Sequence, residues 1–173
     1  MPRYVALLRG INVGTAKRVA MADLRACFEA LGFSGVRTLL QSGNVVFDAA
    51  RPPDARQLES AIAEATGVSA RVVVVAGDEL RAIVAANPLL DVVDDPSRGL
   101  VAFVDGTPDA AAAARPTDAE LLPERVVVGE RAVYQWCPDG VSASKLPAAY
   151  FARMGATARN LRTVDKLVAM LDA

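Results

Sequence analysis

The chain has 173 residues, of which 53% are hydrophobic and 23% are charged. This composition is typical of a globular protein with a buried core and excludes an intrinsically disordered chain. The formal net charge is −1 and the sequence contains no histidine. The charge disfavours a general attraction to nucleic acid or to anionic membranes, and the missing imidazole excludes Ser-His and Cys-His catalysis.

The longest apolar runs fall short of the ~18 residues that a membrane helix needs, and the start of the chain lacks the pattern of a signal peptide. We therefore expect a soluble, cytoplasmic protein with no membrane partner. The two cysteines, Cys27 and Cys137, are too few for a disulfide framework or a thiolate metal cluster, and we expect both to be buried. The sequence indicates no cofactor and no metal site, and it leaves the oligomeric state open.

The first 76 residues alternate strand and helix patterns in the order βαββαβ. The predicted elements are a strand at 4–8, a helix at 21–31 that ends at Gly32, strands at 36–40 and 44–47 joined through 41–43, a helix between Asp54 and Gly67, and a strand at 71–76. The four consecutive valines of the last strand predict a central position in the sheet. The order of elements predicts a ferredoxin-like fold, an antiparallel sheet with helices on one face.

A linking helix and a connector follow the first half, and the second half loosely repeats its order. The predicted elements are a helix at 78–87 that Pro88 ends, a connector at 89–98, a strand at 100–104, an alanine-rich helix after Pro108, strands at 125–128 and 132–136, and helices at 144–154 and 157–171. We therefore predict an α+β fold, in which a ferredoxin-like βαββαβ half is followed by a related βαββα half and a C-terminal helix. The predicted division of the chain is 1–76, 77–98 and 99–173.

The loop after the first strand is flexible and cationic. It contains Arg9, Gly10, Asn12, Gly14 and Lys17, so its backbone N–H groups and positive side chains are suited to a phosphate or a carboxylate. The spacing G-x-x-x-G-x-x-K departs from both common nucleotide-binding fingerprints. The alternative is a plain connecting loop in which the glycines supply positive φ angles.

The turn at 41–44 reads Gln-Ser-Gly-Asn. The amides of Gln41 and Asn44 and the hydroxyl of Ser42 are suited to hydrogen bonds with a polar ligand, although a tight hairpin uses the same residue types. In a ferredoxin-like sheet this turn and the loop at 9–20 leave at the same end. We therefore expect the two segments to face one another.

The predicted last helix places Arg159 and Arg162 in its first turn. Positive side chains oppose the positive end of the helix dipole, at a cost of about 0.3–1 kcal/mol each, which predicts a compensating anion. Arg159, Thr163 and Lys166 recur at helical spacing and predict one basic stripe. The alternative partners are carboxylates of the protein itself, such as Asp165.

The polar motifs belong to a wider set of polar and apolar positions spread along the chain. The set comprises 9–14, Met21, Leu24, 31–33, 36–38, 41–45, Phe47, Asn87, Pro88, 157–160, Thr163, Lys166 and Leu167. This pattern closely resembles a family of bacterial proteins, the domain of unknown function 1697 (DUF1697), and the resemblance spans nearly the whole chain. It implies an α+β fold of two related halves and carries over no activity. It favours a functional role for the polar motifs, because the family pattern includes those positions.

These observations predict one cationic pocket, formed by the loop at 9–14, the turn at 41–44 and the helix start at 157–163. We expect it to bind an anionic small molecule, such as a nucleotide or a phosphorylated metabolite. The predicted ligand-binding residues are Arg9, Gly10, Asn12, Gly14, Lys17, Gln41, Ser42, Asn44, Thr157, Arg159, Asn160 and Thr163.

Two alternative functions stay open. The first is a nucleic-acid-binding module that uses the sheet and a basic face of Arg159, Arg162 and Lys166. Phe47 is the only clear aromatic candidate on the strands of the first half. The second is a structural or interaction protein, in which the polar motifs hold the two halves or a dimer together. The sequence identifies no catalytic residue.

Overall fold

The computed structural model describes residues 1–108 and 115–173. Contacts within the chain define two compact units, the first made of Met1–Leu80 with Leu167–Ala173 and the second of Arg81–Lys166. The alanine-rich helix predicted after Pro108 falls on residues 109–114, outside the described residues. The predicted division at 76 and 98 stays a prediction, and the two units are described separately below.

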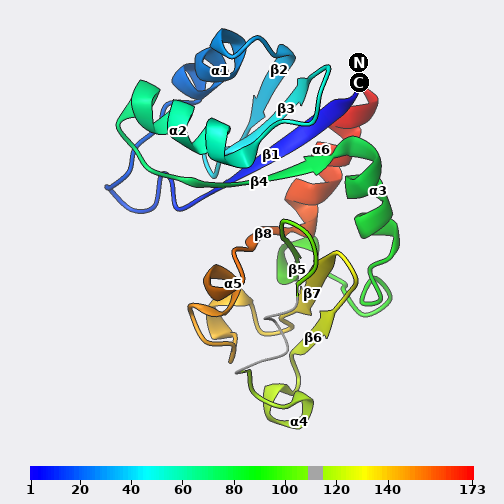
Figure 1. The fold of residues 1–173 in the computed structure, drawn as a ribbon. Helices are drawn as coiled ribbons and strands as arrows, with labels where there is room; N and C mark the ends of the chain where they lie inside the picture. The colour runs from blue at the N-terminus through cyan, green and yellow to red at the C-terminus, as the bar shows by residue number, and fades with distance from the viewer. Residues whose placement is uncertain (109–114) are drawn as a thin grey trace. The chain divides into compact units, whose positions relative to one another are not determined.

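The first unit contains a four-stranded antiparallel sheet (Figure 1). Its elements are β1 (Arg3–Arg9), α1 (Met21–Ala30), β2 (Ser34–Leu39), β3 (Asn44–Asp48), α2 (Ala55–Thr66) and β4 (Arg71–Ala76). The strand order is β2-β3-β1-β4. This order and the element sequence confirm the predicted ferredoxin-like arrangement.

Helices α1 and α2 cover one face of this sheet (Figure 1). Alternate residues of β1, including Ala6 and Leu8, are buried in that core because successive side chains of a strand point to opposite faces. Phe47 of β3 is fully buried, and its ring centroid lies 5.1 Å from that of Phe28 and 4.7 Å from that of Phe33. Burial of each such ring contributes roughly 1.5–3 kcal/mol to folding.

Helix α2 begins and ends where its sequence predicts. The side chain of Asp54 accepts a hydrogen bond from the backbone N–H of Arg56 at 2.9 Å, and Gly67 ends the helix in the left-handed region with φ 71°. Leu58 and Ile62 are buried in the core, whereas Ala65 is exposed.

The prediction that 71–76 is a central strand is wrong, because β4 lies at the edge of the sheet. Val72 is buried on the face that carries α2, and Val73 and Val75 are buried on the opposite face. Burial of both faces gives an edge strand the same run of valines that a central strand has. The sequence pattern therefore reports burial and not the position of the strand in the sheet.

The last residues of the chain belong to the first unit. Arg3 donates hydrogen bonds to the carbonyl oxygens of Leu171 and Ala173, each at 2.9 Å, and Arg37 donates to the carbonyl oxygen of Met170. Arg3 also forms an ion pair with Asp48 at 2.9 Å. Arginine side chains thus satisfy carbonyl groups at the C-terminus of the last helix, which its own backbone leaves without donors.

The second unit repeats the topology of the first. Its sheet has the order β6-β7-β5-β8, which matches β2-β3-β1-β4 strand for strand. Its elements, with the two helices that connect it to the first unit, are α3 (Gly77–Ala85), η1 (Pro96–Arg98), β5 (Gly99–Phe103), α4 (Asp118–Leu121), β6 (Arg125–Val128), β7 (Ala132–Trp136), η3 (Val141–Ala143), α5 (Tyr150–Arg153), β8 (Thr157–Asn160) and α6 (Leu161–Asp172). The predicted α+β fold of two related halves is confirmed, and the second half contains the final strand that the prediction lacked.

The helix predicted at 144–154 is reduced to the short helix α5. Ser144 and Lys145 instead form a loop that is bonded to the side chain of Glu124. Pro147 follows within this segment and disfavours helical backbone at the residue before it. Helical spacing in the sequence is therefore overridden by the loop contacts.

The helix predicted from residue 157 begins at Leu161, because Thr157–Asn160 forms strand β8 and pairs with β5. Asn160 is the N-cap of α6, and its side chain accepts a hydrogen bond from the backbone N–H of Thr163 at 2.9 Å. Arg159 thus lies on a strand. The helix-dipole argument for an anion beside Arg159 does not apply.

Candidate functional site

A pocket of about 520 Å³ opens at one end of the sheet in the first unit. It lies where β1 ends and β4 begins, beside helix α2. Its lining residues are Arg9, Gly10, Lys17, Glu59, Ser60, Ala63, Ser69, Ala70 and Arg71. Three of the predicted site residues, Arg9, Gly10 and Lys17, are therefore brought together in one pocket.

The topology explains why these segments meet. Strand β1 ends at this end of the sheet, and β4, which is antiparallel to β1, begins there. Helix α2 runs toward the same end of the sheet, because it connects the far end of β3 to the start of β4. The loop after β1, the end of α2 and the connection at 67–70 are thus neighbours in space although they are distant in sequence.

Positive charge is concentrated on this pocket. Arg9 and Arg71 are direct partners in the register of β1 and β4, a position where like charges oppose each other, and Lys17 lines the same space. Among the described residues that line the pocket, Glu59 is the only carboxylate. A surplus of cations around a concave site favours a bound anion.

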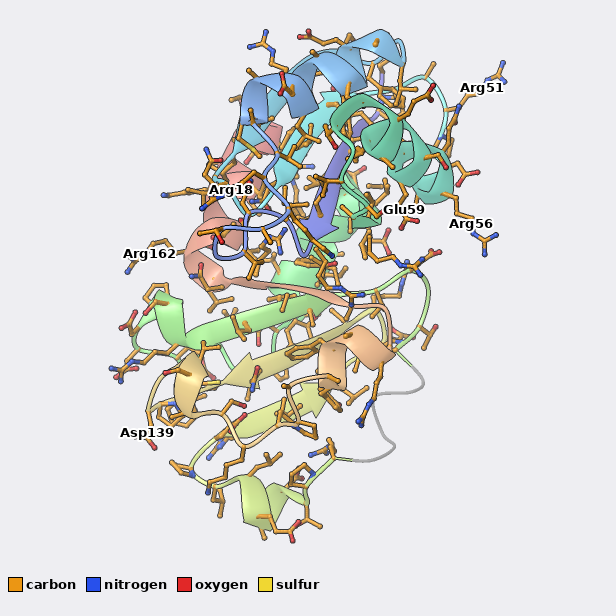
Figure 2. All side chains as sticks on the ribbon, turned by 90° about the vertical axis from the view of Figure 1, so that its left-hand side faces the viewer. Arg18, Arg51, Arg56, Glu59, Asp139 and Arg162 are labelled. Atoms are coloured by element: carbon orange, nitrogen blue, oxygen red, sulfur yellow. The ribbon has the colours of Figure 1, made fainter. Side chains whose placement is uncertain are left out.

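The carboxylate of Glu59 is held in a fixed place by the sheet. Its Oε1 accepts a hydrogen bond from the backbone N–H of Val72 at 3.0 Å, a donor on the edge strand β4. Its Oε2 lies 3.8 Å from Nη1 of Arg71, whose side chain is 76% exposed. Figure 2 shows Glu59 toward the sheet, whereas Arg51 and Arg56 project away into solvent.

The loop between β1 and α1 folds back on itself and carries Lys17 to the pocket. The backbone N–H of Asn12 donates to the carbonyl oxygen of Lys17 at 2.9 Å, and a tight turn joins Val13 to Ala16. Asn12 and Lys17 have φ angles of 52° and 53°, a conformation that asparagine tolerates better than most residues.

The side chain of Asn12 ties this loop to the neighbouring hairpin. It accepts from the backbone N–H of Val19 at 2.9 Å and donates to the carbonyl oxygens of Val19 and Gln41, at 3.0 and 2.8 Å. The predicted approach of the loop at 9–20 to the turn at 41–44 is confirmed. The amide of Asn12 serves this contact, and both of its N–H hydrogens are used.

The turn at 41–44 lies beside the loop but outside the residues that line the pocket. Asn44 is completely buried, and its amide donates to the carbonyl oxygen of Leu39 at 2.8 Å and to the hydroxyl of Ser42 at 3.1 Å. Gly14, at the exposed tip of the loop, accepts a hydrogen bond from Arg18 through its carbonyl oxygen. These bonds shape the loop and the hairpin.

The remaining predicted site residues belong to the second unit. Thr157 and Thr163 are buried, and the side chain of Asn160 caps helix α6. Arg159 is half-buried and donates to the carbonyl oxygen of Ala158 at 3.0 Å, and burial lowers the pKa of its guanidinium to about 10. The single pocket predicted from three segments stays a prediction, and the pocket described above is complete within the first unit.

A separate polar cluster lies inside the second unit. The buried carboxylate of Glu124 accepts hydrogen bonds from the amide of Gln135, from the hydroxyl of Ser144 at 2.6 Å and from the backbone N–H of Lys145 at 2.9 Å. Buried charges are tolerated when several donors surround them. This cluster joins the start of β6 to β7 and to the loop before α5.

Sequence reasoning missed four polar residues of the pocket, Glu59, Ser60, Ser69 and Arg71. No motif marks them, because they lie on a helix face, in the connection before β4 and at the start of β4. The signal that finds them is topological. In the predicted ferredoxin-like order, the connection between the second helix and the fourth strand ends beside the loop that follows the first strand.

Comparison with known proteins identifies the family. A family model described as a protein of unknown function (DUF1697) matches residues 1–134. The chain belongs to this family. The resemblance to DUF1697 that the sequence motifs indicate is thus confirmed, and it reaches from β1 into β7.

A solved structure shares the fold of this DUF1697 member. The conserved bacterial protein SP0830 from Streptococcus pneumoniae is similar with a TM-score of 0.72 and 24% sequence identity, and the match covers 98% of each chain. A search of curated proteins found no match. The fold is therefore shared over the whole chain, and the comparisons assign no activity.

The part of the chain that the structure describes shows neither a membrane-spanning helix nor a cluster of metal ligands. Within it, no helix has both the length and the apolar surface needed to cross a membrane. The same residues contain no group of three or more histidine, cysteine or acidic side chains placed to hold a metal ion.

Proposed function

We propose that the pocket at the end of the first sheet binds an anionic small molecule, a nucleotide or a phosphorylated metabolite. The observation that carries the proposal is the placement of Arg9 and Arg71 as register partners, with Lys17 lining the same space and Glu59 as the single carboxylate among the described lining residues. Guanidinium groups bind phosphate oxygens through paired, charge-assisted hydrogen bonds.

The size of the pocket supports a small-molecule ligand. Its volume of about 520 Å³ lies within the range of roughly 300–1,000 Å³ that is common for ligand pockets. Lys17 is held at the rim by the folded loop, through the hydrogen bond from Asn12 to its carbonyl oxygen. Such prior ordering reduces the entropy that the protein loses when a ligand binds.

One observation disfavours the alternative of a nucleic-acid-binding module in the first unit. Phe47, the aromatic residue that a sheet-based RNA reader would expose, is completely buried between Tyr4, Phe28 and Phe33. Single-stranded nucleic acids are bound largely by stacking of bases on exposed aromatic rings. A pocket for one small anion therefore explains the cations at this end of the sheet better than a nucleic-acid-binding surface does.

Thermal-shift screening against phosphorylated metabolites and nucleotides, followed by calorimetric titration of the best compound, tests the proposal. We expect the Arg71→Ala variant to bind that compound about tenfold more weakly, the effect of one charge-assisted hydrogen bond. Arg71 is 76% exposed, so its removal leaves the core intact. The Lys17→Asn variant removes a second charge and keeps a residue that tolerates positive φ.

The matched control is Arg56→Ala, which removes an exposed arginine that lies one turn before Glu59 and Ser60 on α2 and does not line the pocket (Figure 2). It changes the net charge by the same amount as Arg71→Ala and leaves the lining untouched. We expect it to bind like the wild type. The proposal is wrong if no phosphorylated compound binds, or if Arg71→Ala and Arg56→Ala change the affinity equally.

A further inference from the structure

The lining of the pocket carries information about the ligand beyond its charge. Resting on the proposed function, we infer that the ligand is a phosphorylated polyhydroxy compound, a sugar or polyol phosphate, and that the pocket does not recognise a nucleotide base. The cations come from the end of β1, the following loop and β4, whereas neutral and acidic hydrogen-bonding groups come from α2 and from the connection before β4.

The apolar part of the lining is too small to recognise a base. It consists of Gly10, Ala63 and Ala70, and the described lining residues include no aromatic side chain. Proteins bind bases by stacking them on aromatic rings or between large apolar side chains. The methyl groups of alanine offer little surface of this kind, so a base would gain little binding free energy in this pocket.

Glu59 supplies a carboxylate, which repels the negative charge of a phosphate. One of its oxygens is bonded to the N–H of Val72, and the other lies 3.8 Å from Arg71, beyond the usual length of a hydrogen bond. A carboxylate has about four lone-pair sites, so it retains capacity to accept hydrogen bonds. It repels a second anion but accepts bonds from hydroxyl groups, which polyhydroxy compounds present.

Two serines extend this hydroxyl-binding side. Ser60 follows Glu59 on α2, and Ser69 precedes β4; both residues are exposed and line the pocket. A serine hydroxyl both donates and accepts, and it therefore pairs with a sugar hydroxyl in either direction. The pocket thus combines cations for a phosphate with an acceptor and two hydroxyls for a polyol.

The carbonyl groups at the C-terminus of α2, which would repel a phosphate, are partly satisfied by the protein. The carbonyl oxygen of Ala63 accepts from the N–H of Gly67 at 2.8 Å, and that of Ile62 accepts from the hydroxyl of Thr66 at 2.6 Å. The helix end therefore suits the uncharged, hydroxyl-bearing part of a ligand better than its anionic part.

Titration calorimetry with three probes tests the inference: inorganic phosphate, ribose 5-phosphate and AMP. Ribose 5-phosphate adds hydroxyl groups to phosphate, and AMP carries a base in place of the C1 hydroxyl of ribose 5-phosphate. We expect ribose 5-phosphate to bind at least tenfold more tightly than inorganic phosphate, and AMP to bind no more tightly than ribose 5-phosphate. AMP binding tenfold more tightly than ribose 5-phosphate would overturn the inference and leave the proposed anion site standing.

The Glu59→Gln variant is expected to change the affinities of two of the probes unequally. Glutamine keeps an oxygen that accepts from Val72, so the fold is preserved, but it removes the negative charge. We expect inorganic phosphate to bind several-fold more tightly and ribose 5-phosphate to lose most of its advantage. Arg56→Ala serves as the control and should leave both affinities unchanged.

The outcomes separate the two proposals. Equal tightening of both probes in Glu59→Gln contradicts a hydroxyl-binding role for Glu59 and leaves the anion site intact. If none of the three probes binds the wild type, the inference fails, and the proposed function fails with it when the screen of phosphorylated compounds also finds no ligand.

Discussion

At the scale of single residues, Asn12 shows how a side chain with the chemistry of a ligand-binding group is used by the fold. Its amide forms three hydrogen bonds to the backbone at Val19 and Gln41, and the residue adopts a left-handed conformation. These bonds join the loop after β1 to the β2–β3 hairpin, whereas the backbone N–H of Asn12 donates to the carbonyl oxygen of Lys17.

We predict that Asn12→Ala lowers the free energy of unfolding by about 2 kcal/mol, because backbone groups lose their partner and alanine disfavours positive φ. Urea unfolding of the purified protein measures the change. Thr15→Ala, a substitution at an exposed position of the same loop, is the control and should change stability by less than about 0.5 kcal/mol. Equal effects of the two substitutions would contradict this role of Asn12.

The thiol of Cys137 gives a prediction about alkaline pH. Burial, together with the negative charge of Glu124, raises its pKa from 9.0 to about 12. The folded protein therefore keeps the thiol proton above pH 9 while the unfolded chain releases it. The free energy of unfolding falls as pH rises from 9 to about 12, by at most about 1.4 kcal/mol per pH unit from this group.

The measurement is the difference in unfolding free energy between the wild type and Cys137→Ala, followed across the same pH range. Alanine has no proton to release, so we expect the difference to shrink as the pH rises. A difference that stays constant would show that the thiol titrates alike in the folded and unfolded chains.

At the scale of elements, local signals are sufficient where caps and turns mark the ends. The hairpin strands Arg125–Val128 and Ala132–Trp136 have the predicted bounds, and α2 lies between Asp54 and Gly67 as predicted. Strand β8 could not be predicted in this way, because its identity depends on pairing with the distant strand β5. The cap at Asn160 was a local signal for the true start of α6.

The candidate site divides in the same way. Arg9 and Lys17 are marked by a glycine-containing loop, a pattern that the sequence shows directly. Glu59 and Arg71 become neighbours of that loop only through the topology of the sheet. Asn44 has the residue type of a ligand-binding group, yet its amide is bonded inside the turn, and no sequence pattern separates these two uses.

The buried carboxylate of Glu124 connects three elements of the second unit, and its removal tests that role. We predict that Glu124→Ala lowers stability by about 3 kcal/mol, because Gln135 and Ser144 lose the acceptor for their hydrogen bonds. Hydrogen exchange at the amide of Lys145, which donates to Glu124, should become faster. Glu130→Ala, at an exposed position of the β6–β7 turn, is the control, and exchange that is unchanged in both variants would refute the role.

At the scale of the whole molecule, one topology occurs twice, with strand orders β2-β3-β1-β4 and β6-β7-β5-β8. The first unit is nevertheless not continuous in sequence, because it includes Leu167–Ala173. Within that segment the side chain of Leu171 lies where a Cβ on Gly77 would meet it at 3.2 Å, and the carbonyl oxygen of Leu171 accepts from Arg3. The last turns of the chain are therefore part of the first unit's structure.

We predict that a chain ending at Lys166 loses stability in the first unit by several kcal/mol, because two buried leucines, Leu167 and Leu171, are removed together with the acceptors of Arg3. Hydrogen exchange in β1 and β4 measures the effect. A chain that lacks Ala173 alone should retain nearly full protection. If the shorter chain protects β1 as well as the full chain does, the segment is dispensable.

The central claim is that the end of the first sheet is an anion site, and a titration followed by nuclear magnetic resonance tests it most directly. Ribose 5-phosphate is added to ¹⁵N-labelled protein, and the backbone amide shifts are mapped on the sequence. We expect saturable shifts concentrated at Gly10, Lys17, Ser69 and Arg71, which line the pocket, and a ligand concentration for half-saturation that is about tenfold higher in Arg71→Ala. Shifts that are absent, or that gather at residues outside the pocket, would contradict the account.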